Sequence, residues 1–293
     1  MISRVTASSM THTAMRQLQA NLSELSRLQE QANSQRAFLA PSDDPHAAAT
    51  TLRLHSEQRR TEQHARNIDD GIAWLATADS AITASTALLA RVRNLTVQGA
   101  NDGAMDATAK EALAVELEGI RDELLAQANT TVLGRSVFAG TSDTAAFDPS
   151  GAFSGLPGAE VVRRVSDEAS IRVDTDGAAV FGTGAGSVFS LITDIVADLR
   201  GGQNVGPRLT EIDERRDAML SVQGSVGARQ SQLERAKEAT VQDSVSLEAR
   251  RAAVEDVDSV EVLVRLQAQE LVYRSALAVT GRVLQPTLLE FLR

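Results

Sequence analysis

Two segments of the sequence contain residue types that could bind a phosphate or a calcium ion. Residues 182–187 are glycine-rich and precede a predicted helix, as a phosphate-binding loop does. A P-loop also requires a lysine followed by serine or threonine, and a dinucleotide-binding loop requires a second parallel strand; the sequence offers neither. Residues 174–177 begin like a calcium loop, but apolar residues follow and no glutamate closes it. We therefore interpret the first segment as a flexible junction with Ser187 as a helix cap, and the second as a polar turn.

The other candidates for chemistry are isolated side chains. No two histidines have the i, i+3 or i+4 spacing that places metal ligands on one face of a helix; the four are His12, His46, His55 and His64. The chain has no cysteine, which excludes disulfides and thiolate chemistry. No nucleophile lies in a pattern that would pair it with a base. We therefore expect a protein that is not an enzyme and that has no catalytic residue, cofactor or metal ion.

Composition narrows the class of protein further. Only 3% of the 293 residues are aromatic, which favours helix–helix packing over a core built from large rings. The formal net charge of -10 argues against nucleic acid or an anionic membrane as the main partner. No apolar run is expected to span a bilayer. The N-terminus lacks the apolar block and the cleavage site of a Sec signal peptide.

The two ends of the chain have matching apolar patterns. Near the C-terminus, apolar residues at intervals of three, four or seven predict one face of a helix: Leu263, Leu266, Tyr273, Leu277, Leu284 and Phe291. Near the N-terminus, a similar stripe consists of Met15, Leu18, Leu22, Leu25, Ala32 and Leu39. Such stripes need a covering partner, so we predict that residues 1–44 and 256–293 pair as a coiled coil. Residues before Met10 show little periodicity and are expected to be loose.

Two helices are predicted after the first stripe. A Pro-Ser-Asp-Asp-Pro segment breaks the chain, with Asp44 placed to cap the next helix and Pro45 to begin it. That helix shows apolar residues at every seventh position and continues to about residue 98. A third helix starts near Thr108, which has capping-box spacing with Glu111.

The most regular pattern lies in a later helix that begins near Pro207. Its seventh positions are apolar except for one threonine: Ile212, Met219, Val226, Leu233, Thr240, Leu247 and Val254. We expect the long helices of residues 45–141 and 187–255 to pack antiparallel as a helical rod domain. Residues 142–186 form a small β insert at its tip, a β-rich variable outer domain. The predicted fold is therefore mainly α, an elongated rod with paired terminal helices.

Several of these segments resemble bacterial flagellins. The similarity lies in residues 67–72, 88–101 and 124–130, and covers most of residues 10–141 and 207–293. Its motif residues are Asn67, Asp70, Gly71, Arg91, Arg93, Gln98 and Asn101. The insert between the two regions matches loosely.

Within this family, three details look more like the hook–filament junction proteins, or third hook-associated proteins, than like filament flagellin. The first is the motif made by Pro41, Asp43, Asp44 and Pro45 ahead of the long helix. The second is Gly-Arg-Ser-Val-Phe-Ala-Gly-Thr at residues 134–141, similar to the family's Gly-Arg-Tyr-Leu-Phe-Ala-Gly-Thr with Ser136 in place of tyrosine. The third is the ending at residues 283–292.

The resemblance implies a secreted structural subunit of the bacterial flagellum. Such proteins leave through the flagellar type III system without a cleaved signal peptide, and are extracellular. They form a ring of identical subunits between the first hook-associated protein and flagellin. An export chaperone binds the C-terminal helix before secretion.

These implications define an expected assembly interface. It comprises residues from both terminal stripes: Leu18, Leu22, Leu25, Leu263, Leu266, Tyr273, Leu277, Leu284 and Phe291. Because the stripes are wide, we expect the ends to become ordered when neighbouring subunits cover them. The alternatives are filament flagellin itself, an enzyme whose site lies in the β insert, and an unrelated intracellular helical scaffold.

Overall fold

The structure is a computed structural model that describes residues 2–101, 106–156 and 160–283. It divides into two compact units. The first, which we call the terminal unit, comprises Met1–Arg59 and Ser244–Arg293; the second, the central unit, is Arg60–Asp243. This division assigns the start of the second helix and the end of the sixth to the terminal unit, whereas the sequence analysis placed the boundaries at residues 44 and 256. The functional boundaries stay a prediction.

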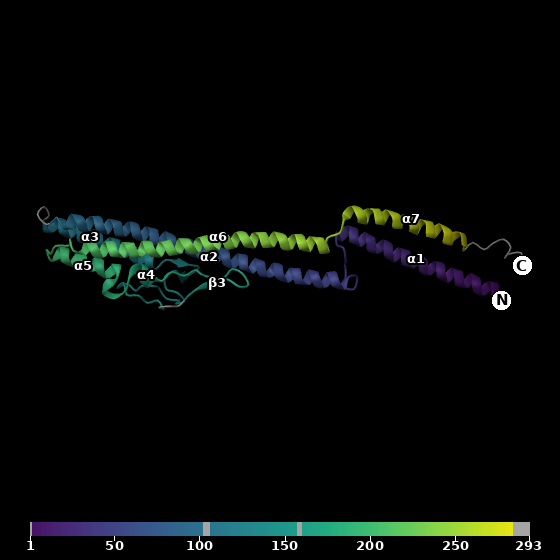
Figure 1. Cartoon of the computed structure of the whole chain (residues 1–293), viewed down its shortest axis with the longest axis horizontal. Helices are drawn as coiled ribbons and strands as arrows, with labels where there is room; N and C mark the ends of the chain where they lie inside the picture. Colours follow the sequence, from purple (N-terminus) through teal and green to yellow (C-terminus); the bar gives the residue numbers. More distant parts are fainter. Residues whose placement is uncertain (1, 102–105, 157–159, 284–293) are drawn as a thin grey trace. The chain divides into compact units, whose positions relative to one another are not determined.

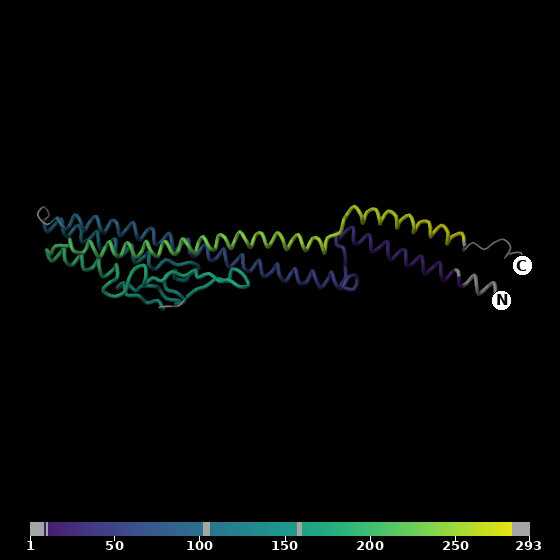
Figure 2. The backbone as a smooth tube through the Cα atoms, viewed as in Figure 1, coloured from purple at the N-terminus to yellow at the C-terminus, as the bar shows by residue number. Residues whose placement is uncertain are grey.

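The described residues are mainly helical, as predicted. In the terminal unit, α1 (Ile2–Ser34) and α7 (Ser259–Val283) lie side by side, in purple and yellow in Figures 1 and 2. The unit also holds the first turns of α2 (Pro45–Gly99) and the last turns of α6 (Arg208–Glu255). Helix α1 begins earlier than the periodicity indicated. It ends at Ser34 because Gln35 takes a left-handed conformation, with a φ of 57°.

The core of the central unit is built from α2, α3 (Ala107–Ala128), α5 (Val188–Arg200) and α6. Helices α3 and α5 pack against each other beside α2 and α6 (Figure 1). The repeated apolar positions of α2 and α6 face this core and have no exposed surface: Ile68, Leu75, Ile82, Leu89, Ile212, Met219, Val226 and Leu233. The seven-residue repeat therefore identified the packed faces of both long helices correctly.

Helix ends follow local capping chemistry, with one difference from the sequence analysis. Ser187 caps α5 as predicted, its hydroxyl accepting a hydrogen bond from the Ser190 N–H at 3.1 Å. The cap of α3 is Asp106, whose carboxylate accepts from the Ala109 N–H at 2.7 Å. The predicted capping box of Thr108 and Glu111 is therefore not the start of this helix. An aspartate nearer the loop satisfies the free N–H groups instead.

The segment between α3 and α5 contains few strands. Two antiparallel pairs are present among the described residues: β1 (Thr131–Val132) with β2 (Arg135–Ser136), and β3 (Val162–Arg164) with β4 (Ser170–Arg172). A short helix, α4 (Gly177–Phe181), and a 3-10 turn (Gly184–Gly186) complete it. The segment packs against the side of α2 and α6 within the central unit, through contacts described below (Figure 1). The sequence pattern predicts a position at the tip of the rod instead.

Phenylalanine rings hold this segment together. The Phe181 ring lies 5.3 Å from Phe138, 5.5 Å from Phe147 and 6.0 Å from Phe189, measured between centroids. Phe153 adds a half-buried ring 5.3 Å from Phe147. These rings come from loops within residues 138–153 and from α4 and α5. Most of the phenylalanines of this protein therefore lie in one cluster, although aromatic residues are rare in its sequence.

The aspartates of the segment that begins like a calcium loop have structural roles. Asp174 is buried and accepts from the Val161 N–H at 2.8 Å, while Arg172 donates to both its oxygens at 2.9 and 2.8 Å. Asp176 caps α4 through the Ala178 N–H. The predicted polar turn is thus wrong in detail, because Asp174 points into the core instead of toward solvent.

Helix α2 corrects the expectation about membrane-spanning length. By length and composition alone, this helix is apolar enough to cross a membrane. Helices inside a protein core meet the same criterion, and Leu75, Ile82 and Leu89 of α2 are covered by the central core. One such helix is weak support for a membrane span.

Candidate assembly interface

The contact between α1 and α7 is an antiparallel heptad seam. On α7 the buried or half-buried side chains include, at intervals of four and three, Val262, Leu266, Gln269, Tyr273, Ala276 and Thr280. On α1 the matching set is Thr11, Ala14, Leu18, Asn21, Leu25 and Leu28. The Gln269 side chain donates to the Asn21 carbonyl at 3.2 Å, and the residues around Ala14 and Ala276 line one groove. This spacing is that of a coiled coil, as predicted.

The seam uses only part of the predicted terminal stripes. Leu18, Leu25, Leu266 and Tyr273 lie in it. Leu22, Leu263 and Leu277 lie beside it, with 47%, 52% and 47% of their surfaces exposed. The last two members of the predicted interface, Leu284 and Phe291, lie outside the described residues. Pairing with α1 therefore leaves a substantial part of the stripe uncovered.

Helix α7 carries apolar residues around most of its circumference. Its exposed large apolar side chains are Val260, Leu263, Val264, Leu271, Val272, Leu277 and Val279, and those of α1 include Met15 and Leu22. We call this set the apolar face. A helix that is apolar on all sides is normally buried on all sides. Fully burying one such side chain contributes about 1.5–3 kcal/mol, so covering the apolar face would stabilise an assembly strongly.

Two connectors lie in the terminal unit: residues 35–44 join α1 to α2, and residues 256–258 join α6 to α7. The first connector binds the second, and the last residue of α6, through its backbone. The Ala37 N–H donates to the Glu255 carbonyl at 2.8 Å, and the Val257 N–H donates to the Gln35 carbonyl at 3.1 Å. The Gln31 side chain donates to the Ala37 carbonyl at 2.7 Å. The end of α1 is thus fixed to the start of α7 where both helices leave the connectors.

The Pro-Ser-Asp-Asp-Pro motif shapes the first connector. The Asp43 carboxylate accepts from the Leu39 and Ala40 N–H groups at 3.1 and 2.9 Å, and these bonds lower the pKa of Asp43. Asp44 accepts from the Ala47 N–H at 2.8 Å and so caps α2, as predicted. Pro41 lies in the connector, and Pro45 is the first residue of α2. The motif therefore turns the chain and starts the long helix.

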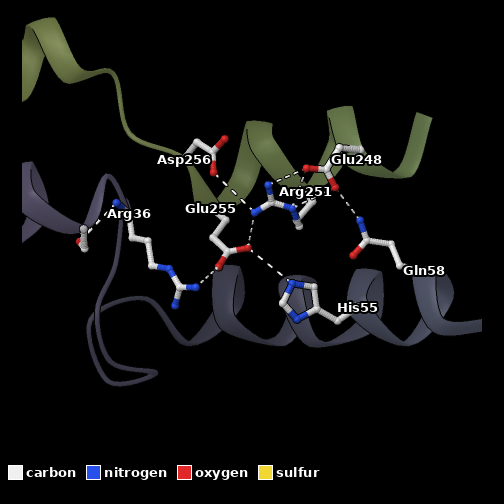
Figure 3. A network of polar contacts seen from close by, with 8 residues as sticks. Arg36, His55, Gln58, Glu248, Arg251, Glu255 and Asp256 are labelled. Atoms are coloured by element: carbon white, nitrogen blue, oxygen red, sulfur yellow. Dashed lines mark hydrogen bonds and ion pairs between the residues drawn. The ribbon is translucent and has the colours of Figure 1, made fainter. Parts of the chain in front are cut away.

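A charged cluster around Glu255 joins these connectors to α2 and α6 (Figure 3). Glu255, the last residue of α6, is only 4% exposed. Its carboxylate accepts from Arg251 at 2.8 Å and lies 3.4 Å from Arg36 and 3.5 Å from His55. The Arg251 hydrogen bond is the main cause of the lowered pKa of Glu255. Its stabilising effect is therefore present above the unfolded-state pKa and is lost as pH falls through the lowered value.

Three residues of the flagellin-like motif, all on α2, hold the β-rich segment in the central unit. The Asn67 side chain donates to the Arg164 carbonyl at 2.9 Å, and Arg163 donates to the Asp70 carboxylate at 2.6 Å. A Cβ atom at Gly71 would lie 3.1 Å from both Leu233 and Val173. Glycine at this position therefore lets α6 and the segment approach α2 closely.

The arginines of the motif join α2 to its neighbours. Arg91 donates to Glu116 of α3 at 2.9 Å, and Arg93 donates to Asp213 of α6 at 2.9 Å. Gln98 and Asn101 are exposed near the end of α2. The residues of the flagellin-like motif that make these contacts thus build the fold of the central unit. None of them lies in the α1–α7 seam.

Within the described parts of the chain, no three histidine, aspartate or glutamate side chains gather as a metal ion would need. His55 belongs to the Glu255 cluster, and His64 lies 3.4 Å from Asp167. Sequence reasoning missed the Glu255 cluster. The only signal for it in the sequence is the acidic run at residues 255–258, which indicates a helix boundary and not a buried cluster.

Comparison with known proteins identifies the family. The bacterial flagellin N-terminal helical region matches residues 5–143, and the bacterial flagellin C-terminal helical region matches residues 209–292. The chain belongs to the bacterial flagellin family. Proteins of this family are structural, non-enzymatic components of the bacterial flagellum.

Two flagellins are similar in sequence to this chain, one over less than half of its length and the other over most of it. Flagellin A of Vibrio anguillarum is 34% identical over 136 residues, which is 46% of this chain and 36% of the relative. The chain thus spans about a third of that flagellin's length. The flagellin of Bacillus subtilis is 24% identical over 257 residues, 83% of this chain and 84% of the relative.

Solved structures with the same fold include hook-associated proteins. A protein described as a flagellar hook-associated protein from Vibrio parahaemolyticus has a TM-score of 0.68 at 21% identity, covering 73% of this flagellin-family chain and all of that one. Hook-associated protein 3 from Legionella pneumophila has a TM-score of 0.60 at 16% identity, covering 67% and 96%. FlgL from Bacillus cereus has a TM-score of 0.59 at 21% identity, covering 68% and 99%. At these identities the likeness describes the fold.

Proposed function

We propose that this flagellin-family chain is the structural subunit of the junction ring between hook and filament. The observation that supports this most is the apolar face that the pairing of α1 with α7 leaves exposed. A neighbouring subunit would cover it. The fold of hook-associated proteins and the Pro41–Pro45 motif support the junction position in particular. In this proposal the partners are further copies of the chain, the first hook-associated protein and flagellin.

The proposal includes a route and an order of events. The chain leaves the cell through the flagellar type III system without a cleaved signal peptide, and a chaperone covers the α7 helix before export. The terminal helices then become fully ordered when neighbours bury the apolar face. The width of that face supports this sequence of partners, since each would cover the same side chains.

Filament flagellin is the second candidate. The similarity to the Bacillus subtilis flagellin over 84% of that protein's length favours it. Among the residues of the insert that the structure describes, no cluster of side chains that could hold a metal ion supports an enzyme. Membership in the flagellin family argues against an unrelated intracellular scaffold.

A strain that lacks this protein separates the two candidates. A junction subunit predicts hooks without filaments and abundant unassembled flagellin in the growth medium, because flagellin is still exported but has no surface on which to polymerise. Electron microscopy of the cells and immunoblotting of the medium measure both. Loss of flagellin from the medium together with the filaments, restored by the wild-type chain, would instead indicate filament flagellin.

A further inference from the structure

The Glu255 cluster connects three segments of the terminal unit at one carboxylate. Glu255 ends α6, Arg36 belongs to the connector between α1 and α2, and His55 belongs to α2. The backbone carbonyl of Glu255 also accepts the Ala37 N–H. One residue therefore contacts the first connector twice, by side chain and by backbone.

The second connector is fixed at the same place. The Val257 N–H donates to Gln35, and Arg36 and Asp256 face each other in an antiparallel bridge. If residues 35–37 move away, both cross-connector hydrogen bonds break together. The departure points of α1 and α7 are thus joined by a single short backbone pairing.

Because the Glu255 carboxylate is buried, losing its partners costs more free energy than the loss of an exposed ion pair would. Arg36 is 61% exposed in its side chain and would contribute little as an isolated surface ion pair. Glu255 is nearly covered, so it needs its charged partners close by, and separating Arg36 from it leaves a buried charge less well compensated. Arg251 shares its guanidinium with Glu248 at 2.7 Å and lies 3.6 Å from Asp256, so its bond to Glu255 is not exclusive.

We propose that Glu255 acts as a latch that makes the two connectors of the terminal unit open and close as one. With the latch closed, α1 and α7 are fixed jointly at the positions where they leave the connectors. With it open, residues 35–37 and 256–257 lose their pairing together. This inference does not depend on the proposed position at the hook–filament junction.

Hydrogen exchange on the purified full chain tests the latch at two amides. In Glu255→Gln, which keeps the size of the side chain, the protection of the Ala37 and Val257 amides is expected to fall about tenfold, by the same factor at both. Central-unit amides near Leu75 and Leu89, in the buried core, are expected to keep their protection.

A matched variant on the same helix provides the control. Glu248→Gln also removes a carboxylate that Arg251 binds, but Glu248 contacts Gln58 and no connector residue. It is expected to leave both amides unchanged. Arg36→Gln removes the exposed cation alone. It should lower the protection of both amides together, by a smaller factor than Glu255→Gln does. It therefore tests the proposal even if Glu255→Gln folds poorly. Unequal changes at the two amides, no change in Glu255→Gln, or an equal effect of Glu248→Gln would each overturn the proposal.

Discussion

Leu277→Arg is expected to leave the fold of the isolated chain intact and to abolish its incorporation into flagella. Leu277 lies beside the α1–α7 seam and is about half exposed, so the arginine can extend into water in the monomer. In an assembly that covers the apolar face, the same guanidinium would be buried without a partner, which costs several kcal/mol, roughly 3–5. Thermal unfolding of the purified variant and immunolabelling of flagella measure the two effects.

An arginine on another helix provides the control for charge. Ser231 is exposed on α6, and its helical neighbours at i±3 and i±4 do not belong to the apolar face, so Ser231→Arg adds the same charge outside that face. It is expected to incorporate normally. Incorporation of Leu277→Arg at the level of Ser231→Arg would mean that this part of α7 does not contact a neighbour.

Phe181→Ala is expected to destabilise the central unit by about 3–5 kcal/mol, because it empties a fully buried site among three other rings. Urea unfolding can be followed by the fluorescence of Trp74, the single tryptophan, which is buried in the same core. The midpoint should move to lower urea concentration.

Phe153→Ala is the matched substitution for this measurement. Phe153 is half-buried, and Phe147 is its only recorded ring contact among the described residues. Its removal is expected to cost clearly less than that of Phe181, since a half-exposed site can collapse or fill with water. Equal losses for the two variants would show that the phenylalanine cluster does not stabilise the unit through ring burial.

The buried faces of the long helices could be predicted from the sequence because the apolar residues repeat on one face only. In α6 the seventh positions from Ile212 to Leu233 are apolar and the intervening residues are largely polar, so only one face could be buried. All of these positions are buried in the structure.

Helix α7 was predicted less well for the opposite reason. Apolar residues occupy several of its faces, so periodicity alone could not decide which face contacts α1. The structure places Val262 and Ala276 in the seam and leaves Leu263 and Leu277 outside it. The ambiguity is informative, since a helix with more apolar faces than its own chain covers is suited to several partners.

The Glu255 cluster and the phenylalanine cluster could not be predicted, because both depend on segments that are distant in the sequence. A glutamate at the end of a charged helix is solvated by default, and nothing local indicates that Arg36 and His55 will surround it. Phe138 and Phe181 lie in segments without periodicity. In both cases the tertiary fold, not the local pattern, decides burial.

The central claim is that the apolar face of α1 and α7 is an assembly surface, and hydrogen exchange before and after assembly tests it most directly. We predict weak protection of the α7 amides around Leu263, Leu271 and Leu277 in the monomer, rising at least about tenfold in the assembled state as neighbours exclude water and restrict local opening. Central-unit amides near Leu75 and Leu89 should be strongly protected in both states. Strong protection of α7 in the monomer, unchanged on assembly, would contradict the claim.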